Sequence, residues 1–158
     1  HMKVAHAIIY THNKWRRDTY TKKLPGDNVS AQARYIPLKD LLPGLQDGYW
    51  FDNVDDCSQY LLQPWDAETI NFLYDIQDIG VAQNERASVL LVQHSSGLWD
   101  LPCSIVQPQE AEPEVLSREL VRQARLSIAC DYWNFVCSHH LIVGSQEQVH
   151  SIYAFERH

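Results

Sequence analysis

Gly97-Leu98-Trp99-Asp100-Leu101-Pro102 begins a segment, ending at Leu126, on which the expected fold depends. Just ahead of it, residues 87–93 form an apolar run, ASVLLVQ, which is typical of a buried strand. Ser95-Ser96-Gly97 is typical of a turn. The pattern therefore predicts two strands joined by a turn, the second of which contains Trp99.

A loop and a helix are expected next. Residues 108–113 are rich in Pro and Glu and predict a loop, and residues 114–126 predict a helix. The spacing of its apolar residues is i, i+4 and i+8, at Leu116, Leu120 and Ala124. One face of this helix is therefore expected to lie against the core.

The end of the chain predicts a pair of strands. Apolar and polar residues alternate over residues 133–143, which places six side chains on one face: Trp133, Phe135, Cys137, His139, Leu141 and Val143. Gly144-Ser145 predicts a turn, and residues 149–155 predict the returning strand.

The beginning of the chain predicts mainly extended structure. Residues 4–10 are expected to form a strand, residues 13–28 a polar and basic loop, and residues 33–38 a short extended piece. Residues 39–42 predict one helical turn that Pro43-Gly44 ends.

A second helix is expected after Asp66, which is a candidate N-cap. Its apolar positions are Ile70, Leu73 and Ile76, and we expect Gly80 to end it and residues 77–86 to form a loop. Strands combined with two helices predict an α+β sandwich.

The order of elements over residues 87–155 resembles that of the Nudix hydrolase superfamily. The sequence box of that family is G-x5-E-x7-R-E-U-x-E-E-x-G-U, in which U is aliphatic. Five positions of the box match this chain, namely Glu110, Arg118, Glu119, Leu120 and Leu126. The resemblance implies a Nudix-like α/β/α sandwich with a mixed sheet, in which residues 81–158 form the half that contains the box.

Four positions of the box differ. Its glycines fall on Ser104 and Arg125, and its paired glutamates fall on Arg122 and Gln123. In the family, carboxylates of this helix hold Mg²⁺ or Mn²⁺, which binds the diphosphate and activates water. Glu119 alone remains of the three, so the resemblance implies weakened or lost hydrolysis.

Three arginines follow one side of the predicted helix, because Arg118, Arg122 and Arg125 are spaced i, i+4 and i+7. One hypothesis places the Arg122 guanidinium where the metal would lie, so that a phosphate is held without being cleaved. The alternative is an exposed row of arginines that pairs with Glu114 and Glu119.

A second basic segment, Lys14-Trp15-Arg16-Arg17, lies in the predicted first loop. A solvated loop is the simpler interpretation. The alternative is the basic rim of a nucleotide pocket, with Trp15 stacked on the base and with Arg16 and Arg17 near the phosphates.

The order of parts is unusual for a Nudix domain, which normally continues past its hairpin into a strand and a final helix. Residues 33–76 resemble that missing half. Residues 3–80 are therefore either the C-terminal half of a circularly permuted single domain, spanning residues 2–158, or an N-terminal extension; a piece of a longer protein is a third alternative. Permutation would be excluded if the helices near residues 70 and 120 packed on different sheets. The similar segments His6-Ala7-Ile8-Ile9-Tyr10 and His150-Ser151-Ile152-Tyr153 suggest neighbouring or exchanged strands.

Composition limits the classes of partner. The chain has 158 residues, 45% of them hydrophobic, and a net charge of −7, so a hydrophobic core is expected and a general nucleic-acid binder is not. No apolar run is as long as a membrane span and no signal peptide is recognised, so we expect a cytoplasmic protein with no membrane partner. The cysteines form no CxxC pair and are expected to be reduced thiols: Cys57, Cys103, Cys130 and Cys137.

Histidines and cysteines raise two further alternatives. A metal site would combine Cys103 or Cys137 with histidines from the set His94, His139, His140 and His150. Because the face shared by Cys137 and His139 is otherwise apolar, and zinc spacing is absent, a core-facing histidine is preferred. No activating partner marks Cys103 as a nucleophile, so a small buried thiol is expected.

Three functional hypotheses follow. The first is a catalytically weakened or inactive Nudix-like domain that needs no cofactor and binds a nucleotide, another phosphate-containing small molecule or a protein partner. Its ligand-binding residues would be Arg118, Arg122, Arg125, Trp15, Arg16 and Arg17. The second is an active pyrophosphohydrolase that uses Glu110 and Glu119, with Glu119 as a ligand of Mg²⁺ or Mn²⁺ and further acids from Asp52, Asp55 and Asp56. The third is a structural interaction module, and exposed terminal strands would make a homodimer plausible.

Overall fold

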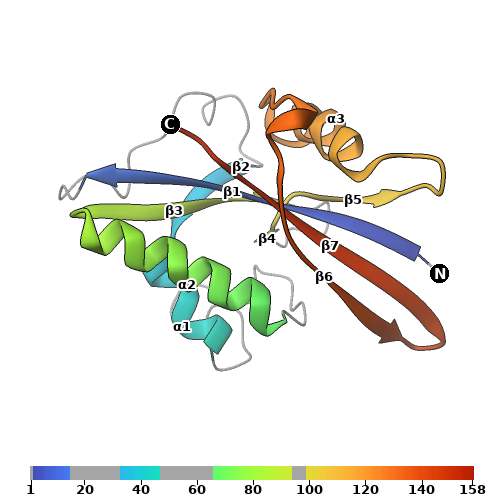
Figure 1. Ribbon diagram of the computed structural model, residues 1–158, viewed down its shortest axis with the longest axis horizontal. Helices are drawn as coiled ribbons and strands as arrows, with labels where there is room; N and C mark the ends of the chain where they lie inside the picture. Colours follow the sequence, from blue (N-terminus) through green and yellow to red (C-terminus); the bar gives the residue numbers. More distant parts are fainter. Residues whose placement is uncertain (1, 15–32, 47–65, 94–98) are drawn as a thin grey trace.

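A single mixed sheet organises the chain. The computed structural model describes residues 2–14, 33–46, 66–93 and 99–158 (Figure 1). The described strands are β1 (Met2–Lys14), β2 (Ala33–Pro37), β3 (Glu85–Gln93), β4 (Trp99–Asp100), β5 (Cys103–Val106), β6 (Asn134–Val143) and β7 (Gln146–Glu156). The described helices are α1 (Leu38–Gln46), α2 (Ala67–Ala82) and α3 (Glu112–Ala124), with a 3₁₀ turn at Cys130–Tyr132.

The strand order places the start of the chain in the middle of the sheet. It is β2-β3-β1-β7-β6, with β4 paired to β3 and β5 paired to β1. Strands β1 and β7 are parallel, with Val4 opposite His150 and His6 opposite Ile152, whereas the other pairs are antiparallel. The two similar segments that begin at His6 and His150 are therefore neighbouring strands, as one of the alternatives predicted.

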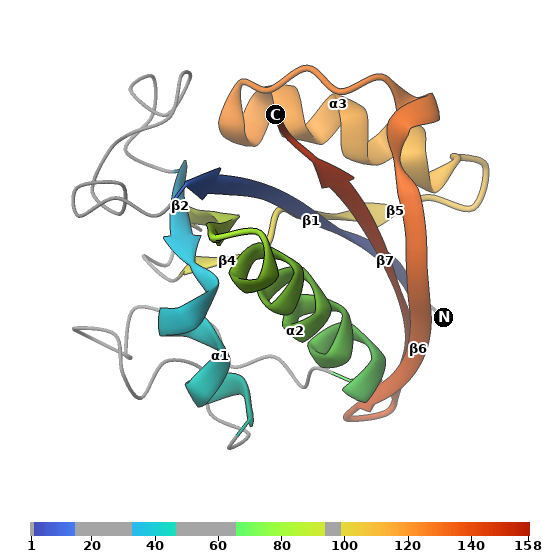
Figure 2. The same cartoon turned by 60° about the vertical axis from the view of Figure 1, so that its left-hand side comes forward.

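Helices cover both faces of the sheet. Helices α1 and α2 lie on one face and α3 on the other, as Figure 2 shows. Because side chains alternate along a strand, Ile8 packs in the core beneath α1 and α2 and its neighbour Ile9 packs beneath α3. Burial on both faces explains the nearly continuous apolar runs of β1 and β3. The predicted α+β class with a mixed sheet is confirmed.

Helices α2 and α3 pack on the same sheet from opposite sides. Helix α2 contacts β3 and β6, and α3 contacts β1 and β5. The arrangement that would have excluded a permuted domain is therefore not found.

Helix α1 is longer than expected, so the prediction of one turn ended by Pro43 is wrong. The helix runs from Leu38 to Gln46 with Pro43 inside it. Leu38, Leu41 and Leu42 are almost fully buried. Their packing offsets the backbone hydrogen bond that a proline cannot donate.

Helix α2 begins as predicted and ends later. The Asp66 side chain accepts a hydrogen bond from the Thr69 backbone N–H at 3.3 Å, as an N-cap does. The predicted end at Gly80 and loop at 77–86 are wrong, because α2 continues to Ala82 and β3 starts at Glu85. The chain turns at Asn84, whose φ is 57°.

Gly80 has a packing role in this helix. A Cβ at this position would lie 3.1 Å from Cδ2 of His12 and 3.3 Å from the carbonyl oxygen of Glu85. The glycine therefore permits a close approach of α2 to the sheet rather than ending the helix.

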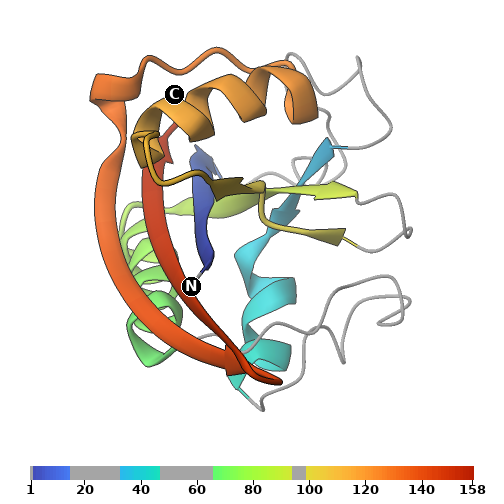
Figure 3. The same ribbon diagram turned by 90° about the vertical axis from the view of Figure 1, so that its right-hand side faces the viewer.

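Strand β6 contains an irregularity that the alternating pattern did not reveal. Phe135 pairs with Tyr153 and Cys137 pairs with Ile152, so Val136 is an extra residue. Trp133 consequently packs in the core on the α3 face and Cys137 in the core on the α2 face. The prediction that residues 133–143 place their alternate side chains on one face is wrong. Figure 3 shows β6 and β7 as a long curved hairpin, closed by Gly144 and Ser145 as predicted.

Candidate functional site

Helix α3 carries most of the residues that resemble the Nudix box. Its first turn carries Glu112 and Glu114, whose charges suit the positive end of a helix. Leu116, Leu120 and Ala124 are buried as predicted. Burial of this face leaves the charged residues between them toward the surface. The helix starts two residues earlier than expected and ends at Ala124.

Glu110 and Arg118 close the loop between β5 and α3. Arg118 Nη1 donates to Glu110 Oε2 at 2.8 Å, and the backbone N–H of Gln107 donates to Glu110 Oε1 at 3.0 Å. The bond from Arg118 holds the pKa of Glu110 below its usual range, and Glu110 raises the pKa of Arg118. Both oxygens of Glu110 are therefore engaged in shaping the loop.

Glu119 is paired with Arg122, which stands where the resemblance to the Nudix box would place a glutamate. Nη2 and Nε of Arg122 lie 2.5 and 2.7 Å from Glu119 Oε2. The Arg122 side chain is 74% exposed and that of Glu119 is 18% exposed. A divalent cation at Glu119 would lie next to the positive guanidinium of Arg122, whose charge repels it.

Gln123 and Arg125 set the geometry at the end of α3. Gln123 Nε2 donates to the Cys103 carbonyl oxygen at 3.0 Å, which ties α3 to β5; a carboxylate could not make this bond. Arg125 follows the helix with φ 53°, in the left-handed region that favours glycine. The position where the box has its second glycine thus retains a glycine-like backbone.

The guanidinium groups of Arg118 and Arg122 do not share a binding partner. Arg118 is bonded to Glu110 and Arg122 to Glu119, so the two guanidinium groups serve different carboxylates. Trp15, Arg16 and Arg17 lie outside the described residues, as do His94 and the acids Asp52, Asp55 and Asp56.

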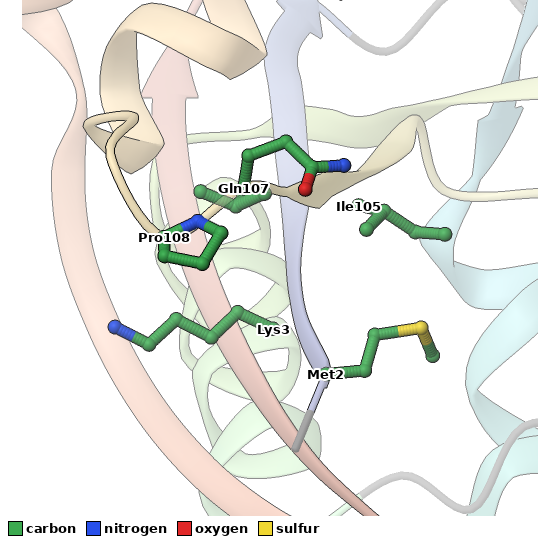
Figure 4. A pocket seen from close by; sticks show the side chains of 6 residues that line it. Met2, Lys3, Ile105, Gln107 and Pro108 are labelled. Atoms are coloured by element: carbon green, nitrogen blue, oxygen red, sulfur yellow. The ribbon is translucent and has the colours of Figure 1, made fainter.

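A shallow pocket lies beside the loop that Glu110 closes. It has a volume of about 560 Å³ and is lined by the start of β1, by β5 and by the residues that follow β5 (Figure 4). The lining residues are Met2, Lys3, Ile105, Val106, Gln107 and Pro108. Its walls are therefore mostly apolar, with one ammonium group and one side-chain amide.

Known proteins provide no match. Neither a protein-family model, a curated protein nor a solved structure matches the chain. Within residues 2–14, 33–46, 66–93 and 99–158, no helix is long and apolar enough to cross a membrane.

The cysteines within the described ranges are free: Cys103, Cys130 and Cys137. Burial, with a smaller contribution from Asp100, raises the pKa of the Cys103 thiol to about 12. Such a thiol remains protonated at neutral pH, which is unsuitable for a nucleophile.

A group of histidines lies on the α2 side of the molecule, and the sequence linked only part of it. His6 Nε2 and His150 Nδ1 are 2.7 Å apart, and the His139 ring stacks on that of His150 with centroids 5.4 Å apart. His140 is exposed and lies outside this group. His6 was missed, because its partners stand more than a hundred residues away and only the parallel pairing of β1 with β7 brings them together.

Proposed function

We propose that the chain is a non-hydrolytic Nudix-like domain whose box segment binds a phosphate group. The observation that carries this proposal is the pairing of Arg122 with Glu119, the remaining metal-type carboxylate of the helix. The bond of Gln123 and the backbone of Arg125 support a framework with the shape of the box and with one of its three metal-binding carboxylates.

Energetics favour phosphate capture at Arg122. Ion pairs with an exposed partner are typically worth about 0–1 kcal/mol, so a phosphate can replace Glu119 on this guanidinium at little cost. A guanidinium also binds phosphate with two parallel hydrogen bonds. Arg118 is a weaker candidate, because its partner Glu110 also holds the loop through Gln107.

Calorimetry with a panel of nucleoside diphosphate derivatives, in buffer containing EDTA, tests this function. We expect binding without metal, and at least about a tenfold loss of affinity in Arg122→Gln, which removes a charged hydrogen-bond donor. Lys39→Gln, which removes a positive charge from an exposed position of α1, on the other face of the sheet from α3, is the control. Absence of binding without metal would contradict the proposal.

The hydrolase alternative has a separate readout. Release of phosphate or pyrophosphate with Mg²⁺ or Mn²⁺, abolished by Glu119→Gln, would establish an active enzyme with those cofactors. We expect no such release, because only Glu119 is a carboxylate among the three positions where the box has metal-binding glutamates, and hard divalent cations need several oxygen ligands.

A protein partner is the second candidate, and the outer strand β6 supports it. Phe135 is 58% exposed and Ile142 is 78% exposed, and β6 pairs with β7 alone among the described strands. An exposed edge with apolar side chains can pair with another chain. Sedimentation of the wild type and of Ile142→Lys would reveal a homodimer as a species that the substitution removes.

We also infer that residues 2–158 form one permuted domain rather than a domain with an N-terminal extension. The central position of β1, between β3 and β7, supports this inference, because an added segment would be expected at an edge. The free thiols of Cys103, Cys130 and Cys137 support a reducing compartment such as the cytoplasm.

A further inference from the structure

The first turn of α2 meets β6 at a cluster of metal-ligating side chains. Asp66 is the N-cap of α2 and Glu68 lies in its first turn. Cys137 belongs to β6, which α2 contacts, and His139 follows it two residues later on the same strand. These four residues come from two segments about 70 positions apart, and neither segment has zinc-like spacing by itself.

The donor atoms are spaced as ligands of one ion would be. One oxygen each of Asp66 and Glu68 and the Sγ of Cys137 lie within 4.8 Å of one another. The Cys137 Sγ is 3.7 Å from Asp66 Oδ2, and His139 Nδ1 is 3.5 Å from Asp66 Oδ1. In a tetrahedral zinc site, bonds of about 2.0–2.3 Å place neighbouring ligand atoms roughly 3.3–3.6 Å apart. The separation of Cys137 Sγ from Asp66 Oδ2 agrees with this geometry to within about 0.1 Å, whereas His139 Nδ1 faces the other carboxylate oxygen, Oδ1, and is not part of the group within 4.8 Å.

His139 supplies a second, independent observation. Its Nδ1 atom is buried and makes no hydrogen bond, since its 3.5 Å approach to Asp66 lacks hydrogen-bond geometry. A buried polar atom without a partner is costly, and a neutral imidazole nitrogen is the commonest protein ligand of metals.

We propose that Asp66, Glu68 and Cys137 form a Zn²⁺ site that fastens the start of α2 to β6, and that the neighbouring His139 imidazole turns toward the ion as its fourth ligand. A thiolate and an imidazole favour Zn²⁺ over Mg²⁺ or Ca²⁺, which prefer oxygen ligands. On binding, the Cys137 thiol releases its proton to solvent and its sulfur coordinates the ion. The two carboxylates and the thiolate carry three negative charges. The two positive charges of Zn²⁺ and the half positive charge of the α2 N-terminus together balance most of them.

Thr69 holds two of the ligands in position. Its hydroxyl bonds to Asp66 Oδ1 and lies 3.2 Å from Cys137 Sγ. Asp66 Oδ2 thus remains directed to the sulfur side of the cluster. Such partners of metal ligands orient the ligating atoms. Four protein ligands make a closed site, so the ion has a structural role, separate from the phosphate site on α3.

Cobalt substitution tests the site directly. Co²⁺ is added to metal-free protein kept reduced with a phosphine, and the near-ultraviolet thiolate-to-cobalt band and the visible tetrahedral bands are recorded. We expect both in the wild type, their displacement by Zn²⁺, and loss of the thiolate band in Cys137→Ser. Cys130→Ser, an exposed cysteine outside the cluster, and His140→Ala are matched controls that should keep the bands.

Zinc affinity gives a second readout that does not need the buried cysteine to be changed. Glu68 is exposed, so Glu68→Gln should fold normally. We expect it to weaken zinc binding by at least about tenfold, because loss of even an outer partner of a ligand weakens affinity by about 10–100-fold. Zinc should raise the melting temperature of the wild type more than that of Glu68→Gln. A wild type that binds neither Zn²⁺ nor Co²⁺ at micromolar concentration, or a thiolate band that survives in Cys137→Ser, would overturn the proposal.

Discussion

Two buried titratable residues give stability opposite dependences on pH. Burial lowers the pKa of His6 from 6.5 to about 3, so the unfolded state binds the extra proton and stability falls as pH drops from 6.5 toward 3. Burial raises the pKa of Asp100 from 3.8 to about 7, although the Leu101 N–H, which donates to its Oδ1 at 2.8 Å, opposes the shift. Here the folded state binds the extra proton, so stability falls as pH rises from 3.8 to 7.

The substitution Asp100→Asn should therefore remove the loss of stability that Asp100 causes as pH rises from 3.8 to about 7. The amide oxygen can still accept from Leu101, and no charge has to be buried at neutral pH. We expect the variant to be more stable than the wild type at pH 8, by roughly 1–4 kcal/mol, and to show little gain at pH 4. Urea denaturation at the two pH values measures this. A variant equally destabilised at both would show that Asp100 has a packing role instead.

Arg125 is a second residue whose backbone sets its energetics. With φ 53°, the Arg125 backbone is in a left-handed conformation, which costs a residue with a side chain about 1–2 kcal/mol relative to the right-handed region. Arg125→Gly should stabilise the chain by roughly 0.5–1 kcal/mol. The gain is smaller than the relieved backbone strain, because glycine also raises the conformational entropy of the unfolded chain. Arg122→Gly, inside the helix, should destabilise it by about 1 kcal/mol. Thermal denaturation of both variants checks the contrast, and a destabilised Arg125→Gly would contradict it.

At the scale of elements, the packing of α2 on the sheet decides where this helix can end. His12, whose Nε2 donates to the Ile76 carbonyl oxygen at 2.9 Å, sits against Gly80. In the sequence, a glycine at this position predicts the end of a helix. In the structure, Gly80 lies within the helix, where its small size permits the close contact with β1 and β3.

The substitution Gly80→Ala tests this contact. Helix propensity alone would favour alanine by about 1 kcal/mol. Overpacking against the Glu85 carbonyl and the fixed His12 ring typically costs about 1–3 kcal/mol, so we expect net destabilisation. Asp78→Ala, at an exposed position of the same helix, should change stability by less than about 0.5 kcal/mol. Urea denaturation would contradict the contact if Gly80→Ala proved more stable than the wild type.

At the scale of the whole molecule, β1 is the feature that joins the two halves. It pairs with β3 on one side, with β5 near its start and with β7 on the other side. Without it, long apolar strand edges would be exposed between the helices.

A fragment and a rearranged chain together distinguish a permuted domain from a domain with an N-terminal extension. A fragment of residues 84–158 should be unfolded by circular dichroism, because it lacks β1 and α2. A chain that starts at residue 84, passes from residue 158 to residue 2 through a flexible linker of about 15 residues and ends at residue 83 should fold, since that linker can span the length of β1. A cooperatively folded 84–158 fragment would establish the extension instead.

Local patterns were sufficient for much of the fold. The strands near Ile8, Val89 and Ile152 and the helix at Leu120 could be predicted, because burial on one or two faces imposes a period on the sequence. The extent of α1 and α2 could not, because Pro43 and Gly80 are tolerated through packing that no local pattern contains. The extra residue at Val136 likewise shifts every later side chain of β6 to the other face.

Residue identity alone shows that positions 122 and 123 carry no carboxylate beside Glu119, where the Nudix box that the sequence resembles has two, because this comparison needs only the spacing along the chain. The partners of the charged side chains depend on the tertiary structure, in which Arg122 bonds to Glu119 and Arg118 bonds to Glu110. It also brought Asp66 to Cys137 and His139. Such meetings depend on how α2 crosses the sheet and how β6 is bulged, and distance along the chain carries no information about either.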